Sequence, residues 1–219
     1  MTRSDLLCVL GTRILGINLT HPTRVAIDGV DAAGKTTLAN ELAFELGRSG
    51  RHVIRASVDG FHNPRVTRRQ DDSAEGYFRC SFNYPSLVSS LLEPLGPNGS
   101  RQFRRATFDF RADSVVSSEI EQAVQNSILV MDGVFLLRRE LRSYWDVSIF
   151  VDATFETVLA RAETRDRELF GGVAAVRERY ESRYIPGQRI YLEQERPRQF
   201  ADIIVINDNV DSPQLERAA

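Results

Sequence analysis

The stretch Gly29-Val30-Asp31-Ala32-Ala33-Gly34-Lys35-Thr36-Thr37 decides the fold of this chain. It fits the pattern G-x-x-x-x-G-K-[ST], the phosphate-binding P-loop. In this motif backbone N–H groups surround a polyphosphate, the lysine reaches the outer phosphates and the threonine hydroxyl binds Mg²⁺. The residues predicted to bind ATP are Gly29, Asp31, Ala32, Ala33, Gly34, Lys35, Thr36 and Thr37.

Lys35 is the single lysine among the 28 lysine and arginine residues of the chain. An ammonium is a compact, mobile point charge, whereas a planar guanidinium is bulkier and cannot follow a phosphate in the same way. A composition that otherwise uses arginine but keeps lysine here therefore indicates phosphoryl transfer. The same count argues against a GTP-binding switch, because the Asn-Lys-x-Asp segment that usually reads guanine needs a second lysine.

The residues on either side of the P-loop support this interpretation over an ordinary glycine turn. Residues 24–27 read as a short buried strand, and residues 36–46 carry apolar side chains at helical spacing. The order strand, loop, helix is what the motif requires, because the helix N-terminus adds unpaired N–H groups and a partial positive charge for the anion.

Further apolar runs alternate with helical patterns along the chain. This alternation predicts right-handed crossovers and an α/β fold of three layers, typical of P-loop NTPases. We expect a mainly parallel sheet of about five strands, helices on both faces and a small lid. The predicted strands are 24–27, 52–58, 128–131, 147–151 and 203–206, and the predicted helices are 86–92, 119–125, 154–169 and 173–184.

We expect residues 1–219 to form a single domain, since this length suits one α/β unit with a full core. Within it, residues 1–22 are predicted to form an N-terminal covering helix. Residues 60–115 are predicted to be an acceptor-binding insert, with a mobile loop at 63–81. Residues 161–185 are predicted to form the lid region.

The composition points to a small-molecule partner. The net charge of −2 and the pI near 6.0 give no general attraction for nucleic acid or an anionic membrane. No apolar run approaches the ~20 residues of a membrane span, and no signal-peptide pattern is present, so we expect a cytoplasmic protein. Cys8 and Cys80 are too few for a disulfide framework. The sequence is compatible with a homo-oligomer and does not decide the oligomeric state.

Two aspartates follow predicted strands at the edge where ligands of parallel sheets gather. Asp132 ends an apolar strand and is predicted to contact Mg²⁺ together with Thr36, the alternative being a simple turn residue. Asp59 ends another strand and is predicted to be the base that takes the proton of an attacking hydroxyl. Its alternative is the turn residue of an ordinary Asp-Gly pair.

Arg161 and Arg165 lie one turn apart on a predicted helix face. We predict that Arg161 and Arg165 are catalytic residues together with Lys35 and Asp59. The two arginines would neutralise charge on the transferring phosphoryl group. A solvated helix surface is the alternative, since acidic residues lie between them. His62 is either a substrate contact beside the base or a polar loop residue.

Several segments together resemble the uridine kinase and phosphoribulokinase family of P-loop kinases, in the same order along the chain. The resemblance spans roughly residues 24–209 and implies ATP and Mg²⁺ as cofactors, a catalytic base at Asp59, a metal contact at Asp132 and lid arginines at Arg161 and Arg165. The segments are residues 29–37, 59–62, 108–110, 129–133, 161–166 and 201–204.

The chain also departs from the uridine kinase pattern. The Phe-Asp-His-Pro segment of those kinases is Phe82-Asn83-Tyr84-Pro85 here, Asp113 stands where they have a base-reading His, and their Arg-Gly-Arg lid motif is Phe170-Gly171-Gly172. The segment 59–62 is closer to pantothenate-kinase-like and sugar-kinase-like relatives. The predicted substrate contacts are Phe61, His62, Asn83, Tyr84, Phe108, Arg111 and Asp113.

The leading hypothesis is ATP-dependent phosphorylation of a nucleoside hydroxyl, with uridine or cytidine as the acceptor. The second is phosphorylation of a sugar, a pantothenate-like compound or another vitamin-like alcohol. The third is a nucleotide-binding regulator without turnover, which the presence of both Asp59 and Asp132 disfavours.

Overall fold

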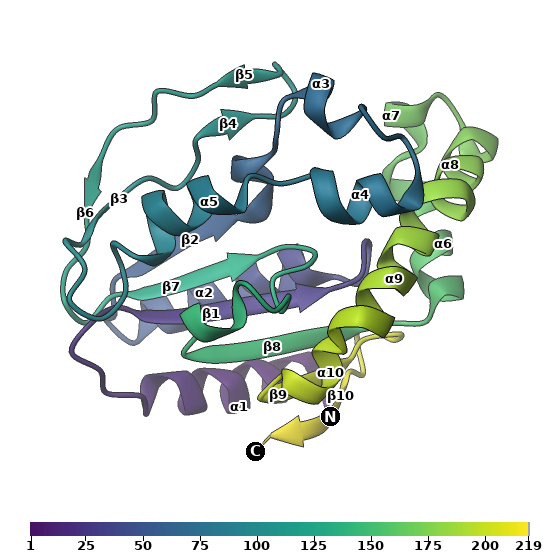
Figure 1. The fold of residues 1–219 in the computed structure, drawn as a ribbon. Helices are drawn as coiled ribbons and strands as arrows, with labels where there is room; N and C mark the ends of the chain where they lie inside the picture. Colours follow the sequence, from purple (N-terminus) through teal and green to yellow (C-terminus); the bar gives the residue numbers. More distant parts are fainter. Residues whose placement is uncertain (219) are drawn as a thin grey trace.

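Six strands form the central sheet of the computed structural model, which describes residues 1–218 (Figure 1). Their order is β10-β9-β8-β1-β7-β2. All neighbours from β9 to β2 are parallel, and β10 runs antiparallel to β9. The five predicted strands are the parallel ones, so the predicted mainly parallel sheet is confirmed. The bounds are β1 (Thr23–Gly29), β2 (Val53–Ser57), β7 (Ile128–Asp132), β8 (Val147–Asp152), β9 (Ile203–Ile206) and β10 (Gln214–Ala218).

The central strands are covered on both faces. Every residue of β1 is buried, and successive side chains alternate between two apolar clusters: Val25 and Ile27 belong to one, and Ala26 belongs to the other. Near-continuous apolar runs are what a parallel strand needs, because helices exclude water from both of its sides. The sheet is therefore a rigid support for the loops at its carboxyl end.

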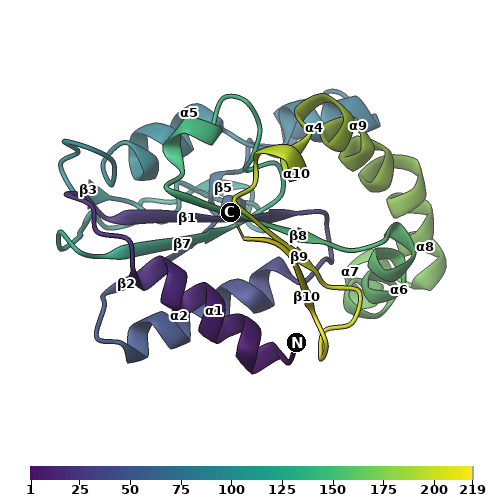
Figure 2. The ribbon, with the colours of Figure 1, turned by 90° about the horizontal axis from the view of Figure 1, so that it is seen from below.

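Figure 2 shows helices on the two sides of the sheet, with α1 and α2 together on one face and α4, α5 and α9 on the other. Apolar residues of α6 and α8 belong to the same cluster as those of α1 and α2. Among residues 1–218, no helix is both long and apolar enough to cross a membrane. The bounds are α1 (Arg3–Leu15), α2 (Lys35–Arg48), α4 (Ala74–Cys80), α5 (Tyr84–Leu87), α6 (Phe155–Arg165), α7 (Arg167–Phe170), α8 (Val173–Arg179), α9 (Ile185–Glu195) and α10 (Pro197–Phe200).

The helix predicted within residues 1–22 is α1. Thr2 and Asp5 form a reciprocal capping box at its start, which satisfies N–H groups that have no partner within the helix. Leu6, Leu10 and Ile14 are fully buried and join the apolar cluster beneath the sheet. Their spacing places all three on the face of α1 that meets the core.

The prediction of a mobile loop at residues 63–81 is wrong, because this segment is largely helical. It contains α3 (Arg65–Arg68) and α4. The Ser73 hydroxyl caps α4 by accepting from the Gly76 N–H, and Tyr77 and Phe78 enter the core. The buried rings of Tyr77 and Phe78 anchor this segment to the core, although most of its residues are polar.

The helix predicted over residues 119–125 is also wrong. This segment contains the short strand β6 (Glu121–Gln122), which pairs with β3 (Gln102–Phe103). Glu121 forms an ion pair with Arg105 at 2.6 Å, a contact between distant residues that periodicity cannot reveal. A second short pair, β4 (Phe108–Asp109) with β5 (Ser114–Val115), lies beside α3 in Figure 1.

The predicted helices 154–169 and 173–184 are present but divided. The first consists of α6 and α7, and the second consists of α8 followed by a π-helical turn, η4 (Tyr180–Tyr184). The chain continues directly into α9, which the sequence analysis did not predict. The predicted helix 86–92 is covered by α5 and a second π-helical turn, η2 (Val88–Leu92).

Candidate functional site

The P-loop follows β1 and leads directly into α2. A Cβ on Gly29, where φ is +150°, would lie 2.2 Å from the carbonyl oxygen of Val151. A Cβ on Gly34, where φ is +97°, would lie 2.5 Å from Nδ2 of Asn207. The backbone of β8 leaves no room for a side chain at Gly29, while at Gly34 the positive φ is what favours glycine.

The N-terminus of α2 has no side-chain cap. Unpaired N–H groups and the positive end of the helix dipole therefore meet at this point, which suits a bound anion. Ala32, with a φ of +53°, and Ala33 lie in the loop itself. Thr36 and Thr37 are exposed in the first turn of α2.

The Lys35 ammonium is buried at the base of the loop, with 7% of the residue exposed. Its Nζ donates to the carbonyl oxygen of Val30 at 2.6 Å. Burial lowers the pKa of Lys35, while the charges of Asp31, Asp132 and Asp28 act in the opposite direction. The ammonium is thus held where several carboxylates compensate its lost hydration.

The P-loop residue Asp31 is bonded to helices on the opposite side of the site. Its Oδ2 accepts from the Tyr77 hydroxyl at 2.7 Å and from Nε2 of Gln188 at 2.9 Å, and its N–H donates to Oε1 of Gln188 at 3.2 Å. Tyr77 belongs to α4 and Gln188 belongs to α9. Asp31 therefore links the loop to the predicted acceptor insert.

A carboxylate that the sequence analysis missed lies directly before the P-loop. Asp28 is fully buried and accepts from the N–H groups of Gly29 at 2.8 Å and Leu137 at 3.1 Å, and from the Tyr191 hydroxyl. Burial raises the pKa of Asp28 despite these hydrogen bonds. Asp28 ties β1 to the loop after β7 and to α9.

Thr36 and Asp132 meet as predicted for a metal site. The Thr36 hydroxyl donates to Oδ2 of Asp132 at 2.5 Å, and Asp132 is 2% exposed. The second carboxylate oxygen, Oδ1, accepts from Nη2 of Arg55 at 2.5 Å. Arg55 comes from β2 and was not predicted as a site residue.

These donors suit Mg²⁺ bound together with a nucleotide. Within the part of the chain that the structure describes, no group of three or more His, Cys, Asp or Glu side chains gathers into a metal cage. Mg²⁺ commonly binds through one or two protein oxygens, substrate phosphates and water. The Thr36 hydroxyl retains lone pairs for a cation after donating to Asp132, which fits that mode of binding.

A 3₁₀ turn, η1 (Val58–Phe61), follows β2. Asp59 lies in this turn, and His62 comes directly after it. The Asp59 side chain is 58% exposed, and its Oδ1 lies 3.5 Å from Nε2 of His62. The His62 Nδ1 lies 3.0 Å from the carbonyl oxygen of Ser81 and donates to it. In the imidazolium form both ring nitrogens carry a proton, so Nε2 can also donate to Asp59. Asp59 thus has an accessible carboxylate with a fixed neighbour.

Opposing influences act on the Asp59 carboxyl group. Partial enclosure raises its pKa, but the His62 hydrogen bond and the positive charges of His62, Lys35 and Arg165 together hold the pKa below its ordinary value. Charges from the P-loop and the predicted lid thus act at the predicted base. Asp59 stays ionised and ready to accept a proton at neutral pH.

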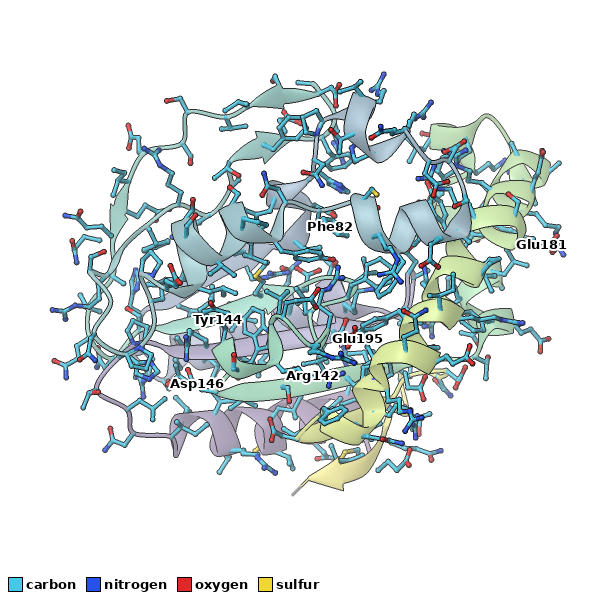
Figure 3. The ribbon with its side chains drawn as sticks, in the orientation of Figure 1. Phe82, Arg142, Tyr144, Asp146, Glu181 and Glu195 are labelled. Atoms are coloured by element: carbon cyan, nitrogen blue, oxygen red, sulfur yellow. The ribbon has the colours of Figure 1, made fainter. Side chains whose placement is uncertain are left out.

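Aromatic rings surround His62. Its imidazole lies 4.4 Å from the ring of Phe82 and 5.1 Å from that of Phe110, centre to centre. Figure 3 labels Phe82 on the segment between α4 and α5. The predictions for Phe61 and Phe108 need correction, because Phe61 is 0% and Phe108 is 6% exposed. Both rings lack accessible surface, and Phe110 is the neighbour of His62 instead.

The remaining predicted substrate contacts differ in their surroundings: the Asn83 oxygen is engaged, whereas the buried Tyr84 hydroxyl has no hydrogen-bond partner within residues 1–218. Asn83 caps α5 by accepting from the Ser86 N–H at 3.0 Å. The Tyr84 ring lies 4.3 Å from the Arg138 guanidinium carbon, and burial raises the pKa of Tyr84 to about 12.

Asp113 closes the insert onto α3. Its Oδ1 accepts from the Arg65 N–H at 2.8 Å and from Nη2 of Arg68 at 3.1 Å. Arg111 is exposed, and its guanidinium lies 5.8 Å from the ring centre of Phe110. Substrate contacts of Asp113 and Arg111 stay predictions.

The two predicted catalytic arginines of α6 differ in their surroundings. Arg161 donates to the carbonyl oxygen of Asn207 at 2.7 Å, to that of Asp208 at 3.0 Å, and to those of Ala32 and Ala33 at 3.4 Å. It therefore braces the P-loop against the segment after β9. Along α6 a groove of about 630 Å³ is lined by Glu156, Thr157, Ala160, Arg161, Thr164 and Arg165.

Arg165 is more than half exposed and pairs with the next residue, Asp166, at 2.7 Å. It also donates to the Tyr180 hydroxyl at 2.9 Å. Its charge acts on both Lys35 and Asp59. Arg165 is therefore the more exposed of the two α6 arginines, whereas Arg161 is bonded to backbone carbonyls of the P-loop.

The parallel sheet, the glycine loop and the uncapped α2 define a P-loop protein of the α/β class. The model of the Phosphoribulokinase / Uridine kinase family matches residues 25–206. The chain belongs to this family.

Curated relatives and solved structures agree with this assignment. Uridine-cytidine kinase B of Dictyostelium discoideum is 25% identical over 151 residues, which are 67% of this chain and 59% of that protein. The chain thus spans less than two thirds of that relative. Uridine kinase of Chlamydia pneumoniae is 25% identical over 185 residues, covering 83% of this chain and 80% of that protein. A possible uridine kinase from Bacillus stearothermophilus shares the fold, with a TM-score of 0.72 at 24% identity over 92% of this chain and 97% of that one.

Proposed function

We propose that this protein is an ATP-dependent kinase that transfers the γ-phosphoryl group to a hydroxyl of a small molecule, with a pyrimidine nucleoside as the leading acceptor. The observation that carries the proposal is the place of Asp59 relative to the P-loop. Ser57 at the end of β2 pairs in register with Asp132 at the end of β7, and Asp132 is bonded to Thr36 of the P-loop. Asp59 follows two residues after Ser57 with an accessible carboxylate at this same end of the sheet.

The nucleotide side of the proposal rests on the P-loop. The uncapped start of α2 and the buried Lys35 suit the phosphates. A Mg²⁺ ion held by Thr36 beside Asp132 would neutralise charge on the phosphates. Lys35 and Arg165 supply further positive charge from the protein itself.

The chemical step follows from the position of Asp59. The acceptor oxygen forms a bond to the γ-phosphorus, the bond from that phosphorus to the oxygen of ADP breaks, and the acceptor proton passes to the Asp59 carboxylate. His62 holds Asp59 from one side, and its imidazole packs against the buried ring of Phe82 and the partly exposed ring of Phe110. We propose that the acceptor lies against His62 and Phe110.

The relatives support a nucleoside as the acceptor. The curated proteins described above carry the names uridine-cytidine kinase and uridine kinase. Aromatic side chains near Asp59 are suited to packing against a flat base.

A sugar or vitamin-like alcohol is the second candidate. It is favoured by Asn83 and Asp113, which stand at nucleoside-reading positions of the resemblance but are bonded inside the protein. One oxygen of each side chain is thus engaged inside the protein, and neither residue is of the type found in the uridine kinase pattern.

An acceptor panel tests the proposal. ADP release would be measured with ATP and Mg²⁺ against uridine, cytidine, simple sugars and pantothenate-like alcohols, with an acceptor-free reaction as the blank. We expect uridine or cytidine to give the highest kcat/KM. ADP release from an alcohol alone would replace the nucleoside with the second candidate. Calorimetric binding of ATP without turnover on any acceptor would favour the regulator.

A further inference from the structure

Arg55 makes an unusually complete set of contacts for a residue on the edge strand β2. Its Nη2 lies 2.5 Å from Oδ1 of Asp132, and its Nε lies 3.0 Å from Oδ1 of Asn40. Its Nη1 donates to the carbonyl oxygens of Val130 at 3.3 Å and of Ala56. Every nitrogen of the guanidinium is therefore engaged, which fixes the orientation of its planar fork.

These contacts close a ring with the helix that carries the metal-binding hydroxyl. Thr36 donates to Oδ2 of Asp132, Arg55 donates to Oδ1 of the same carboxylate, and Arg55 returns to α2 through Asn40. Thr36 and Asn40 are four residues apart in α2, on one face of the helix. Arg55 thus fixes the position of Asp132 relative to Thr36.

The same pair sets the charge of the metal site. The carboxylate of Asp132 is buried, with 3% of its side chain exposed, and it is in direct contact with the Arg55 cation. Its charge also interacts with that of Lys35. The Arg55 cation offsets the charge of Asp132 directly, while Lys35 is shared with Asp31 and Asp28. Asp132 paired in this way attracts a free divalent cation only weakly, until nucleotide phosphates add negative charge.

We infer that Arg55 is a positioning residue that makes metal binding depend on bound nucleotide. It neutralises Asp132 and occupies Oδ1, so that the Thr36 hydroxyl is oriented for a metal that arrives with the phosphates. This inference rests on the proposed Thr36 and Asp132 metal site. It adds a residue of β2 to that site and an order of binding in which metal follows or accompanies nucleotide.

Mn²⁺ binding to the full chain tests the inference without any acceptor or turnover. Free Mn²⁺ would be followed by electron paramagnetic resonance during titration of the protein, first alone and then with saturating ADP. For the wild type we expect tight binding with ADP and weak but measurable binding without it. For Arg55→Met we expect Mn²⁺ without nucleotide to bind at least about tenfold more tightly than to the wild type, because one nearby positive charge is gone.

Three further variants separate charge from geometry and from fold. Arg51→Met removes the same charge just before β2 begins, at the opposite end of the strand, and should behave as the wild type. Arg55→Lys keeps the charge but loses the fork, so its affinity for Mn²⁺ alone should stay within about threefold of the wild type. Arg55→Gln removes the charge yet keeps a donor for Asp132, and it replaces Arg55→Met in the test if that variant does not fold.

The outcomes are distinguishable. Affinity for Mn²⁺ alone that is unchanged or lower in Arg55→Met and Arg55→Gln, while the ADP complex still binds Mn²⁺, overturns the role of Arg55 and leaves the proposed function standing. Failure of the wild type to bind Mn²⁺ even with ADP removes the metal site and the inference together. Tighter binding in both neutral variants, but not in Arg51→Met, supports the inference.

Discussion

The two halves of the candidate site are built from different kinds of structure. The nucleotide half, consisting of β1, the P-loop, α2 and β7, is fixed by buried strands and by a glycine that has no room for a side chain. The acceptor half, residues 59–115, is joined by side-chain contacts such as those of Asn83 and Asp113. Backbone geometry changes little among proteins that share a fold, whereas surface side chains exchange freely. The sequence and fold therefore indicate the phosphate donor more clearly than the phosphate acceptor.

The sharpest way to break the nucleotide half is Lys35→Ala. We expect ATP-supported turnover to fall by about 10³ or more, because the buried ammonium that meets the phosphates is lost. ADP release measures the effect, with thermal unfolding as a check of the fold. Arg48→Ala at the far, exposed end of the same helix is the control and should retain full rate. A Lys35→Ala enzyme with a tenth of the normal rate would contradict the role.

Asp59→Asn tests whether the acceptor half carries the chemistry. The amide has nearly the same shape but cannot take the acceptor proton, so we expect the rate to fall by at least about 10². Binding of a fluorescent ATP analogue should be unchanged, since Asp59 lies outside the P-loop. Glu119→Gln, an exposed carboxylate elsewhere on the surface, is the matched control. Turnover within a few-fold of the wild type would remove Asp59 from its proposed role.

Asn83→Asp sharpens the comparison by restoring the carboxylate of the uridine kinase pattern. Asp can still accept from the Ser86 N–H, so the start of α5 is preserved. If the acceptor is a nucleoside, its KM should fall by about tenfold, because a charged acceptor strengthens a hydrogen bond to a ribose hydroxyl. An unchanged KM for uridine would argue against a ribose at this position. Asn83→Ala should lose about 1 kcal/mol of stability through the cap alone.

The smallest effect is expected for His62→Gln, and it is a shift in pH dependence. The pKa of Asp59 lies below its ordinary value of 3.8. The wild-type carboxylate therefore stays ionised until the pH falls to this lowered pKa. Loss of the His62 hydrogen bond and charge raises the pKa of Asp59, and the acid limb of kcat/KM should move to higher pH. A pH–rate profile measures this change. An unmoved acid limb would show that His62 does not act on the base.

The linkage to stability has a definite sign. A lowered carboxyl pKa in the folded state contributes stability above the unfolded value, and this contribution disappears as the pH falls through the folded value. For Asp59 the window therefore lies below its ordinary pKa of 3.8. His62→Gln should reduce the stability gained across that acidic window.

The strands and the P-loop could be predicted because their signals are local. Apolar runs such as residues 128–131 must be buried, and the glycine pattern around Lys35 has one geometry. Site residues could not be predicted where their position depends on partners that lie far away along the chain. Asp28 was missed although a carboxylate inside an apolar strand was a usable signal, because its partners Leu137 and Tyr191 lie more than a hundred residues away.

The acceptor half was predicted less accurately for the same reason. Phe61 and Phe108 were chosen by their position beside motifs, but both are buried. Arg55 carries no motif, and only the pairing of β2 with β7 brings it to Asp132. Sequence spacing identified which strands end at the site, while the packing of side chains decided which residues are accessible there.

The bonds of Asp31 have a consequence for how the two substrates influence each other. One carboxylate of the phosphate loop is shared with Tyr77 of α4 and Gln188 of α9. If nucleotide binding alters these bonds and raises the affinity for the acceptor by some factor, thermodynamic reciprocity applies. Bound acceptor must then raise the affinity for the nucleotide by the same factor. Cooperativity between donor and acceptor would then be transmitted through a single side chain.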